Sequence, residues 1–529
     1  MKTHSTIGFD VIQFFNPLVI DLLTNDEKLN DLTTNTQAIN ERITQRANFS
    51  TTQRSALHIA LTKQYNALWQ HTTTHKQRIE TQLTTLLNTN TFTVTTGHQL
   101  CLMTGPLYFV YKIITAINYA EQLNTAHPQH HFIPVYWMAT EDHDFEEVNH
   151  FNIHNKKLTA TAIAGNAVGA ITLDNIPQLR EQLVALLGTT EHSSAILNLF
   201  DSCYATTNNL AQATQRLVHE LFGQYGVVII DANTPELKYA FSTIINEELT
   251  TSPSYSITTK TIESLTNKGY KSIQVTPRPI NLFLLHNNTR QRIIAQGTNY
   301  TAGNAEFTLQ QLHNNTANIS PNVLLRPVYQ ETILPNIAYV GGGGELAYWL
   351  QLKPLFDYYK TPFPQLLLRH SALLIDVPAN EKLTALQLNV NDLFETDEVI
   401  TKKYIALNTE KEFNTNNYQQ QLQTIYSALS NELATIDKTL APIANAELKK
   451  TIDGLHALNN KVNKALKQQH ANGITQALKQ KEKYFPNNGL QERYENIFQY
   501  INKFGFKIID DLKQELNETT PTFKIITLQ

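Results

Sequence analysis

The hydrophobic pattern between about residues 91 and 376 alternates short apolar runs with longer stretches of helical period. The clearest apolar runs end at polar or glycine residues, and hydrophobic positions three and four apart follow them. This order is typical of an α/β protein in which helices join the strands of a parallel sheet through right-handed crossovers. The pattern predicts strands at 92–96, 133–138 and 227–230, and helices at about 106–123, 206–222 and 235–249.

Two stretches interrupt this alternation, and we expect both to be insertions at edges of the sheet. Residues 150–205 contain a strand-like and a helical piece, whereas residues 270–320 are β-rich, with a hairpin that turns at Asn287-Asn288. The core is therefore expected in three parts. The remaining boundaries are 1–90 for an N-terminal helical segment, 91–149, 206–269 and 321–385 for the core, and 486–529 for a C-terminal helix and tail docking on it.

The last third of the chain changes to a long helical rhythm. From Tyr418 to Ile443 the hydrophobic residues step by four and three, and after a break around 437–442 the rhythm continues from Leu448. This spacing predicts an antiparallel helical hairpin with coiled-coil packing within residues 386–485. An ordinary helical bundle packed on the body is the alternative.

Composition narrows the class of protein. A chain of 529 residues with 41% hydrophobic residues is expected to form several packed units, and a net charge of −4 argues against a nucleic-acid binder. Two cysteines exclude a disulfide scaffold and a cysteine-rich zinc site, and Cys101 is expected to be a buried structural thiol. No segment approaches the ~20 apolar residues that span a bilayer, so we expect a reduced cytoplasmic protein without a membrane partner.

The first motif that carries chemistry is TTGHQLCLMTGPLYFVYK, residues 95–112. A β-branched run stops at Gly97-His98-Gln99, and Gly105-Pro106 opens a helical stretch, which gives a strand, a polar turn and a helix. A helix N-terminus beside the end of a strand has free N–H groups and is a natural anion site. The motif therefore predicts nucleotide or carboxylate binding, with His98 and Gln99 at the mouth of the site.

The second motif is PVYWMATEDHDFEEVN, residues 134–149. An apolar strand ends there and releases Glu141, Asp142, His143 and Asp144 at the edge where open α/β sheets bind ligands. A carboxylate at this position is suited to hold an amine, and a histidine between carboxylates is suited to transfer protons. Capping of the next helix by Asp144 is the alternative. One histidine among carboxylates also suits Mg²⁺ carried by a nucleotide better than a structural zinc.

The third motif is RPVYQETILPNIAYVGGGGELAYWLQLK, residues 326–353. Gly341–Gly344 stand between an apolar run and a helix expected to begin near Glu345, and a backbone without side chains lets an anion or carbonyl approach closely. Arg326 and Gln330 precede the glycines, and arginine is a natural partner of carboxylate or phosphate. An internal salt bridge is the alternative for Arg326, and Tyr348 is expected in the core.

These three blocks, together with LQERYENI near the C-terminus, resemble the BshC family of bacillithiol biosynthesis over essentially the whole chain. The resemblance implies a Rossmann-like core of the class I aminoacyl-tRNA synthetase and nucleotidyltransferase type, with two connecting insertions and a coiled coil used for homodimerisation. It also implies a ligase that joins L-cysteine to glucosaminyl-malate. Two features of that superfamily are missing, a KMSKS-like lysine loop and a Cys/His set for zinc.

On this basis we expect ATP or another nucleotide as the cofactor, Mg²⁺ with it, no zinc and no other metal site. Only small molecules and a second copy of the chain are expected as partners. The expected catalytic residues are His98 for the phosphate charge, Asp142 for an amine and His143 for its proton. Arg326 is expected to bind the malate carboxylates. The expected substrate-binding residues are Gln99, Asp144, Arg326, Gln330, Tyr339 and Glu345, and the nucleotide-binding residues are Gly97, His98, Gly105, Gly341, Gly342, Gly343 and Gly344.

Two other functions stay open at the level of the sequence. One is a different ATP-dependent ligase or nucleotidyltransferase on the same fold. The other is a non-catalytic binding protein of the bacillithiol pathway, which the missing lysine and zinc motifs favour. The density of polar residues at three strand ends argues against that second function.

Overall fold

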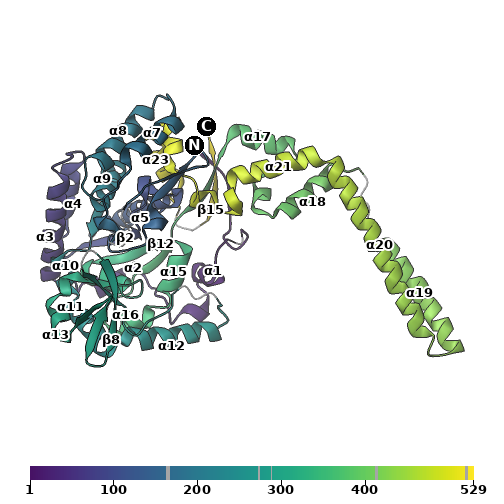
Figure 1. Ribbon diagram of the computed structural model, residues 1–529, viewed down its shortest axis with the longest axis horizontal. Helices are drawn as coiled ribbons and strands as arrows, with labels where there is room; N and C mark the ends of the chain where they lie inside the picture. Colours follow the sequence, from purple (N-terminus) through teal and green to yellow (C-terminus); the bar gives the residue numbers. More distant parts are fainter. Residues whose placement is uncertain (13, 163–166, 272–274, 287–288, 411–414, 519–521) are drawn as a thin grey trace. The chain divides into compact units, whose positions relative to one another are not determined.

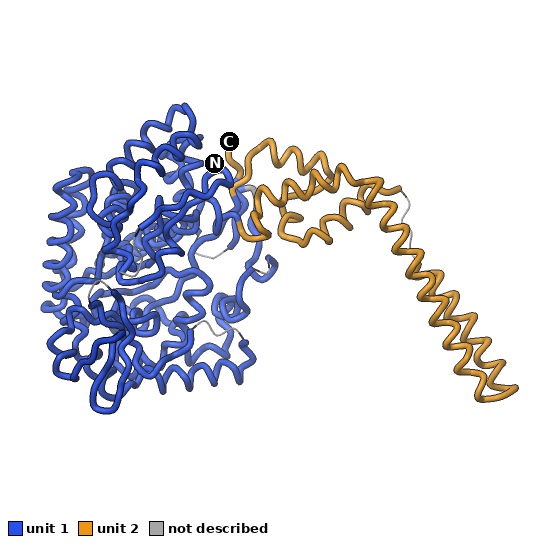
Figure 2. Tube along the Cα trace, viewed as in Figure 1, with its two compact units in different colours: residues 1–373, 491–526 blue, residues 374–490, 527–529 orange. Residues whose placement is uncertain are grey.

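A computed structural model describes residues 1–529 apart from residues 13, 163–166, 272–274, 287–288, 411–414 and 519–521. The chain divides into two compact units, coloured separately in Figure 2. Unit 1 contains Met1–Leu373 and Gln491–Ile526, and unit 2 contains Leu374–Leu490 and Thr527–Gln529. Among the described residues, no helix has both the length and the apolar character needed to cross a membrane.

Unit 1 is built around a five-stranded sheet in which all neighbouring strands are parallel. Both central strands are buried on both faces, as expected for a sheet covered by helices on each side. The three strands predicted from the sequence are present, so the predicted α/β fold is confirmed. The order across the sheet is β13 (Gln365–Leu368), β12 (Asn336–Gly341), β2 (Thr91–His98), β3 (His131–Met138) and β6 (Val228–Asp231).

The predicted helices are present, with two differences. The helix α5 (Leu107–Ala126) follows β2 and packs its small and aliphatic residues on the sheet, where Ala116, Ala120 and Leu123 join Phe92 and Val94 in one buried cluster. The helix expected at 206–222 begins later, as α9 (Leu210–Phe222). The helix expected at 235–249 is divided at its middle into α10 (Pro235–Ala240) and α11 (Ser242–Thr251).

The N-terminal segment, predicted to be helical, begins with a strand. This strand belongs to a three-stranded sheet of order β1 (Lys2–Ile7), β15 (Phe523–Leu528) and β14 (Ser371–Asp376). Four helices follow it before the main sheet begins, in agreement with the predicted helical segment. They are α1 (Pro17–Leu23), α2 (Ile39–Arg46), α3 (Thr51–Leu68) and α4 (Lys76–Thr85).

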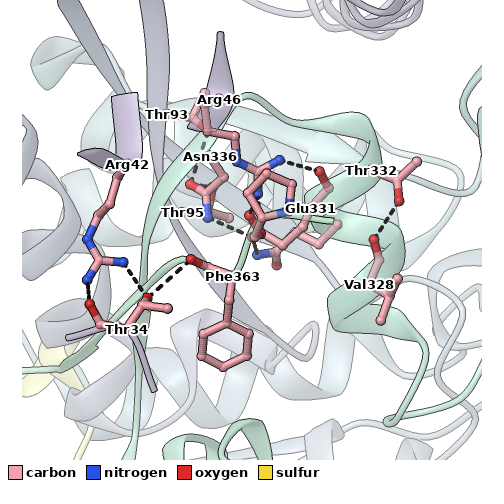
Figure 3. A network of polar contacts seen from close by, with 12 residues as sticks. Thr34, Arg42, Arg46, Thr93, Thr95, Val328, Glu331, Thr332, Asn336 and Phe363 are labelled. Carbon is pink, nitrogen blue, oxygen red and sulfur yellow. Dashed lines mark hydrogen bonds and ion pairs between the residues drawn. The ribbon is translucent and has the colours of Figure 1, made fainter. Parts of the chain in front are cut away.

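A buried polar network connects α2 to α14 and the main sheet (Figure 3). Arg46 pairs with the carboxylate of Glu331, and both side chains are almost fully inaccessible. Asn336, at the start of β12, donates to Glu331 over 2.8 Å and accepts from Thr93 and Thr95 of β2 over 3.1 and 2.8 Å. Burial raises the pKa of Glu331 to about 7, although Arg46 acts in the opposite direction. The network fixes α14 (Arg326–Ile333) against the sheet.

The two predicted interruptions have the expected secondary structure. The first contains the hairpin of β4 (His150–Ile153) and β5 (Lys156–Thr159), then α7 (Ile176–Leu187) and α8 (Ser193–Phe200). The second is an antiparallel sheet, and the turn predicted at Asn287-Asn288 lies outside the described residues. The exact insertion boundaries stay predictions. The strand order of this second sheet is β10 (Ala305–Phe307), β9 (Asn299–Ala302), β8 (Thr289–Gln296), β7 (Leu282–His286) and β11 (Ile319–Pro321).

Unit 2 is helical and contains the predicted hairpin (Figure 1). Its two long helices, α19 (Asn416–Ile436) and α20 (Ala441–Gln469), run antiparallel, and Tyr426 and Thr451 share a hydrogen bond of 3.1 Å between them. No residue of α19 is buried, and several of its apolar residues are among the most exposed in the chain. The other α-helices among the described residues of unit 2 are α17 (Val377–Ala385), α18 (Asp397–Leu407) and α21 (Ala471–Tyr484).

The C-terminal segment of unit 1 packs against the start of α5. It is not the single helix that QERYENIFQYI suggests, because a 3₁₀ turn at Gln491–Arg493 precedes α22 (Ile497–Phe504) and α23 (Ile508–Glu515). The side chain of Asn496 donates to the carbonyls of Met103 and Gly105, each over 2.6 Å. The segment thus closes over the turn that follows β2.

Candidate active site

A cavity of about 900 Å³ lies where the carboxyl ends of the parallel strands meet, all of it in unit 1. The ends of β2, β3, β12 and β13 all contribute to its wall, as expected for a ligand site of an open α/β sheet. The structure brings together most of the residues predicted for a site. Those on the wall are Gly97, His98, Gln99, Asp142, His143, Asp144, Arg326, Tyr339, Gly342, Gly343, Gly344 and Glu345.

His98 ends β2 and is held as a neutral imidazole. Its ring lies 5.3 Å from the rings of both Tyr108 and Phe109, and burial, with a contribution from Lys112, lowers its pKa to about 3. The ring nitrogen Nδ1 is 3.1 Å from the carbonyl oxygen of Gln99, which only accepts, so Nδ1 carries the proton. Nε2 of His98 is therefore a hydrogen-bond acceptor. A phosphate oxygen is also an acceptor, so Nε2 can bind it only after the ring gains a proton.

At the N-terminus of α5, where the first motif predicts an anion site, the first N–H group is already used within the protein. The backbone N–H of Leu107 donates to the carbonyl of Glu495 over 2.8 Å, and Leu107 is fully buried. Gly105 does not line the cavity. Its φ of +60° and the 2.7 Å that would separate an added Cβ from Cys101 explain why glycine stands there. The prediction that Gly105 contacts a nucleotide is therefore not supported by its position.

Lys112 is a buried cation on the cavity wall that the sequence motifs did not single out. Its Nζ donates to the carbonyl of Gly97 over 2.6 Å and pairs with the carboxylate of Glu345. Lys112 lies one turn into α5 and lines the cavity, although burial leaves only 4% of its side chain exposed. A lysine at YFVYK, in an otherwise apolar helix face, was the signal available in the sequence.

The end of β3 supplies an acidic cluster. Gln99 Nε2 donates to Asp142 over 2.9 Å and to Glu147 over 2.8 Å, while His143 lies 3.5 Å from Asp142 and 3.8 Å from Asp144. Asp144 stands at the N-cap position of α6 (Phe145–Val148) but makes no side-chain capping bond, so the capping alternative is not supported. Asp142 and His143 both line the cavity.

The same cluster is the one place where the described residues gather three potential metal ligands. The ligand atoms of Asp142, His143 and Asp144 lie within 4.8 Å of one another. Two carboxylates and one imidazole suit a Mg²⁺ ion that also binds nucleotide phosphates. Both cysteines are buried and free, and burial raises the pKa of Cys101 to about 12, in agreement with the predicted structural thiol.

The glycine run forms the turn between β12 and α15 (Gly343–Trp349). Gly342 is the N-cap of α15, and its N–H donates to Glu345 over 2.8 Å. Tyr339 donates to the same carboxylate over 2.9 Å. Burial alone would raise the pKa of Glu345, but Lys112 and the N–H of Gly342 lower it to about 2. The carboxylate of Glu345 thus occupies part of the space that the sequence assigns to a ligand anion.

Gly341 and Gln330 lie behind the cavity wall rather than on it. An added Cβ at Gly341 would come within 2.9 Å of Leu346, so this glycine serves packing. Gln330 is fully buried and accepts from Arg326 over 3.2 Å. The position of Gln330 does not support the prediction that it binds substrate, since its side chain contacts Arg326 instead.

Arg326 lines the cavity at the start of α14. Its guanidinium donates to the Tyr348 hydroxyl over 2.7 Å and lies 5.9 Å from the centre of the Tyr339 ring. Because its hydrogen-bond partners are neutral, the alternative of an internal salt bridge is not supported. Tyr348 is buried, as expected, and also lines the cavity.

Sequence reasoning missed a group of arginines on the cavity wall. Arg369 directly follows β13 and pairs with buried Glu492 over 2.7 Å. Because ligands bind at the carboxyl ends of parallel strands, its position after a strand would have predicted it as a site residue. Arg278, Arg290 and Arg292 come from the antiparallel sheet of residues 282–321 and the segment before it, where the alternation in TRQRII was the available signal. Arg493 comes from the 3₁₀ turn Gln491–Arg493. These missed residues are Arg278, Arg290, Arg292, Arg369 and Arg493.

Curated relatives match the chain over nearly its full length. A protein of Flavobacterium psychrophilum named "Putative cysteine ligase BshC" is 37% identical over 98% of both chains, and its namesake in Flavobacterium johnsoniae is 37% identical over 99% of both. A Campylobacter jejuni crystal structure described as a "putative arginyl t-RNA synthetase" covers 81% of this chain and 94% of its own. Its identity of 9% and TM-score of 0.23 are too low to bear on the fold.

Family models cover both parts of the chain. The N-terminal Rossmann-like domain of bacillithiol biosynthesis BshC matches residues 5–370, and the C-terminal coiled-coil domain of the same family matches residues 372–528. Together with the parallel sheet, the cavity at its carboxyl edge and the helical hairpin, these matches show that the chain belongs to the BshC family.

Proposed function

We propose that this protein is a ligase that joins the carboxylate of L-cysteine to the amine of glucosaminyl-malate and so forms bacillithiol. The observation that carries the proposal is a cavity with cationic and acidic groups side by side, in a chain whose relatives are named as cysteine ligases. Such a cavity suits substrates that carry both carboxylates and an amine.

Amide formation from a free carboxylate is uphill in water, and a nucleotide such as ATP supplies the required activation of the cysteine carboxylate. We assign its phosphates to the backbone of Gly343 and Gly344 and to Gly97 and His98, which line the same cavity, because the N–H of Gly342 already donates to Glu345. We propose Asp144, beside Asp142 and His143, as a ligand of an accompanying Mg²⁺. A neutral His98 that gains a proton as a phosphate approaches would stabilise the negative charge there.

The amine that attacks the activated carboxylate needs a partner and must lose a proton. Asp142 accepts from Gln99 and from the backbone N–H of His143, which fixes its carboxylate in one orientation. We assign Asp142 to the amine and His143 to the proton, which Nδ1 can accept once Arg290 turns from it to a bound ligand. The two residues lie side by side, and half or more of each side chain is sheltered from solvent.

The proposal is tested with purified protein, cysteine, glucosaminyl-malate and ATP, with product and AMP measured by mass spectrometry. We expect bacillithiol in an amount equal to the AMP, and we expect Asp142→Asn to abolish it without a change in the melting curve. Other amino acids in place of cysteine separate a cysteine ligase from another ligase on this fold. ATP binding without any product from the panel would contradict the proposal.

We further propose that the protein forms a homodimer through the α19–α20 hairpin. Tyr418, Ile425 and Ile436 on α19 and Ile443 on α20 are more than half exposed in the single chain. Helices of this kind bury such residues in a partner helix. The two free thiols fit a reducing compartment, so we propose a cytoplasmic location.

A further inference from the structure

Two arginines of the cavity wall share one aromatic ring. Arg290 and Arg292 alternate along β8 and so point to the same face of the strand. Phe283 lies opposite Arg292 in the antiparallel register, and its ring centre is 4.0 Å from the guanidinium of Arg290 and 4.8 Å from that of Arg292. Two like charges on one face repel each other, which makes the pair receptive to an anion.

Arg292 has an unused donor. Its Nη1 is buried and has no hydrogen-bond partner among the residues that the structure describes. Burial lowers the pKa of Arg292, and the neighbouring cation Arg278 acts in the same direction. A buried N–H without an acceptor is unfavourable, and a carboxylate oxygen from a ligand would satisfy it and the charge together.

The arginines stand directly beside the acidic cluster. Arg290 Nη1 donates to His143 Nδ1 over 3.3 Å, and its other terminal nitrogen donates to the Pro321 carbonyl over 3.2 Å. A ligand that spans both groups needs an amine at one end and more than one negative charge at the other. Among the proposed substrates, glucosaminyl-malate has this composition, with a sugar amine and two malate carboxylates.

We propose that Arg290 and Arg292, with Arg278 at the rim, bind the malate dicarboxylate of the acceptor substrate and thereby direct its sugar amine toward Asp142. This assignment rests on the proposed function and deepens it. It assigns the malate to this pair instead of to Arg326. The guanidinium of Arg326 already donates to Tyr348 and Gln330, whereas Arg292 has a buried N–H donor without a partner among the described residues.

The test measures binding by calorimetry, without turnover, for three probes: glucosaminyl-malate, the methyl glycoside of glucosamine, which lacks malate, and ATP with Mg²⁺. Wild-type protein is expected to bind glucosaminyl-malate at least tenfold more tightly than the methyl glycoside. Arg292→Gln is expected to weaken the binding of glucosaminyl-malate about ten- to hundredfold and to remove the preference over the methyl glycoside. The affinity for ATP should stay unchanged. Arg180→Gln, which removes an arginine of an exposed surface pair with Asp201, is the matched control.

Arg278→Gln, at an exposed rim position, is the second variant and covers the case in which Arg292→Gln does not fold. It should weaken the binding of glucosaminyl-malate about threefold or more. Unchanged glucosaminyl-malate affinity in both variants, or a selective loss of ATP affinity, would overturn the assignment. If wild-type protein binds glucosaminyl-malate but makes no product, the proposed ligation is contradicted. The affinity of Arg292→Gln compared with that of wild type still decides where the malate binds.

Discussion

Replacing Lys112 by methionine should destabilise unit 1 strongly, because it leaves the carboxylate of Glu345 without its cation. Removal of one partner from a buried ion pair costs roughly 3–5 kcal/mol. The Lys112 side chain is 4% exposed, but Glu345 is 28% exposed to the cavity and keeps its bonds from Gly342 and Tyr339. These features favour a loss of stability at the lower end of this range, about 3 kcal/mol. Such a loss corresponds to roughly a hundredfold larger unfolded fraction.

All three tryptophans, Trp69, Trp137 and Trp349, lie in unit 1, so their fluorescence during urea unfolding reports on that unit alone. Lys63→Met is the matched control, because Lys63 pairs with Glu236 at the surface with 71% of its side chain exposed, and such pairs contribute little.

The double variant Lys112→Met with Glu345→Gln separates the charge from the packing. If the uncompensated carboxylate causes the loss, the second substitution should restore about half of it or more, since a neutral amide is far less costly to bury. A Lys112→Met protein as stable as wild type, or a double variant no more stable than Lys112→Met, would refute the reasoning.

Three further predictions follow from the same geometry. Because the pKa of Glu345 is lowered from 4.5 to about 2, its contribution to stability is full above pH 4.5 and is lost as pH falls through about 2; acid unfolding should show a smaller pH dependence in Glu345→Gln. Arg326→Ala should melt at a lower temperature than wild type and should weaken the binding of glucosaminyl-malate less than Arg292→Gln does. If Arg326→Ala instead has a normal melting curve and the larger loss of affinity, Arg326 is the residue that binds the malate. Ile425→Glu with Ile436→Glu should convert a dimer to a monomer in light scattering, whereas wild-type protein that is already monomeric would contradict dimerisation through the hairpin.

Local sequence was sufficient for the elements and for much of the cavity wall. The runs at 92–96 and 133–138 are apolar over a short length and end in polar residues, and this pattern depends only on neighbours in the chain. Parallel strands place their carboxyl ends at one edge, so His98, Asp142 and Gly342–Gly344 meet there once the sheet forms. The helical hairpin followed from the same kind of local periodicity.

The tertiary structure alone decided which polar groups remain available to a ligand. The N–H of Leu107 is taken by Glu495 from near the other end of the chain, and the carboxylate of Glu345 is held by Lys112 from another helix. Arg292 reaches the cavity from a separate antiparallel sheet. No local pattern encodes these outcomes, because a hydrogen bond or ion pair between distant segments exists only after packing has brought both partners out of water and beside each other.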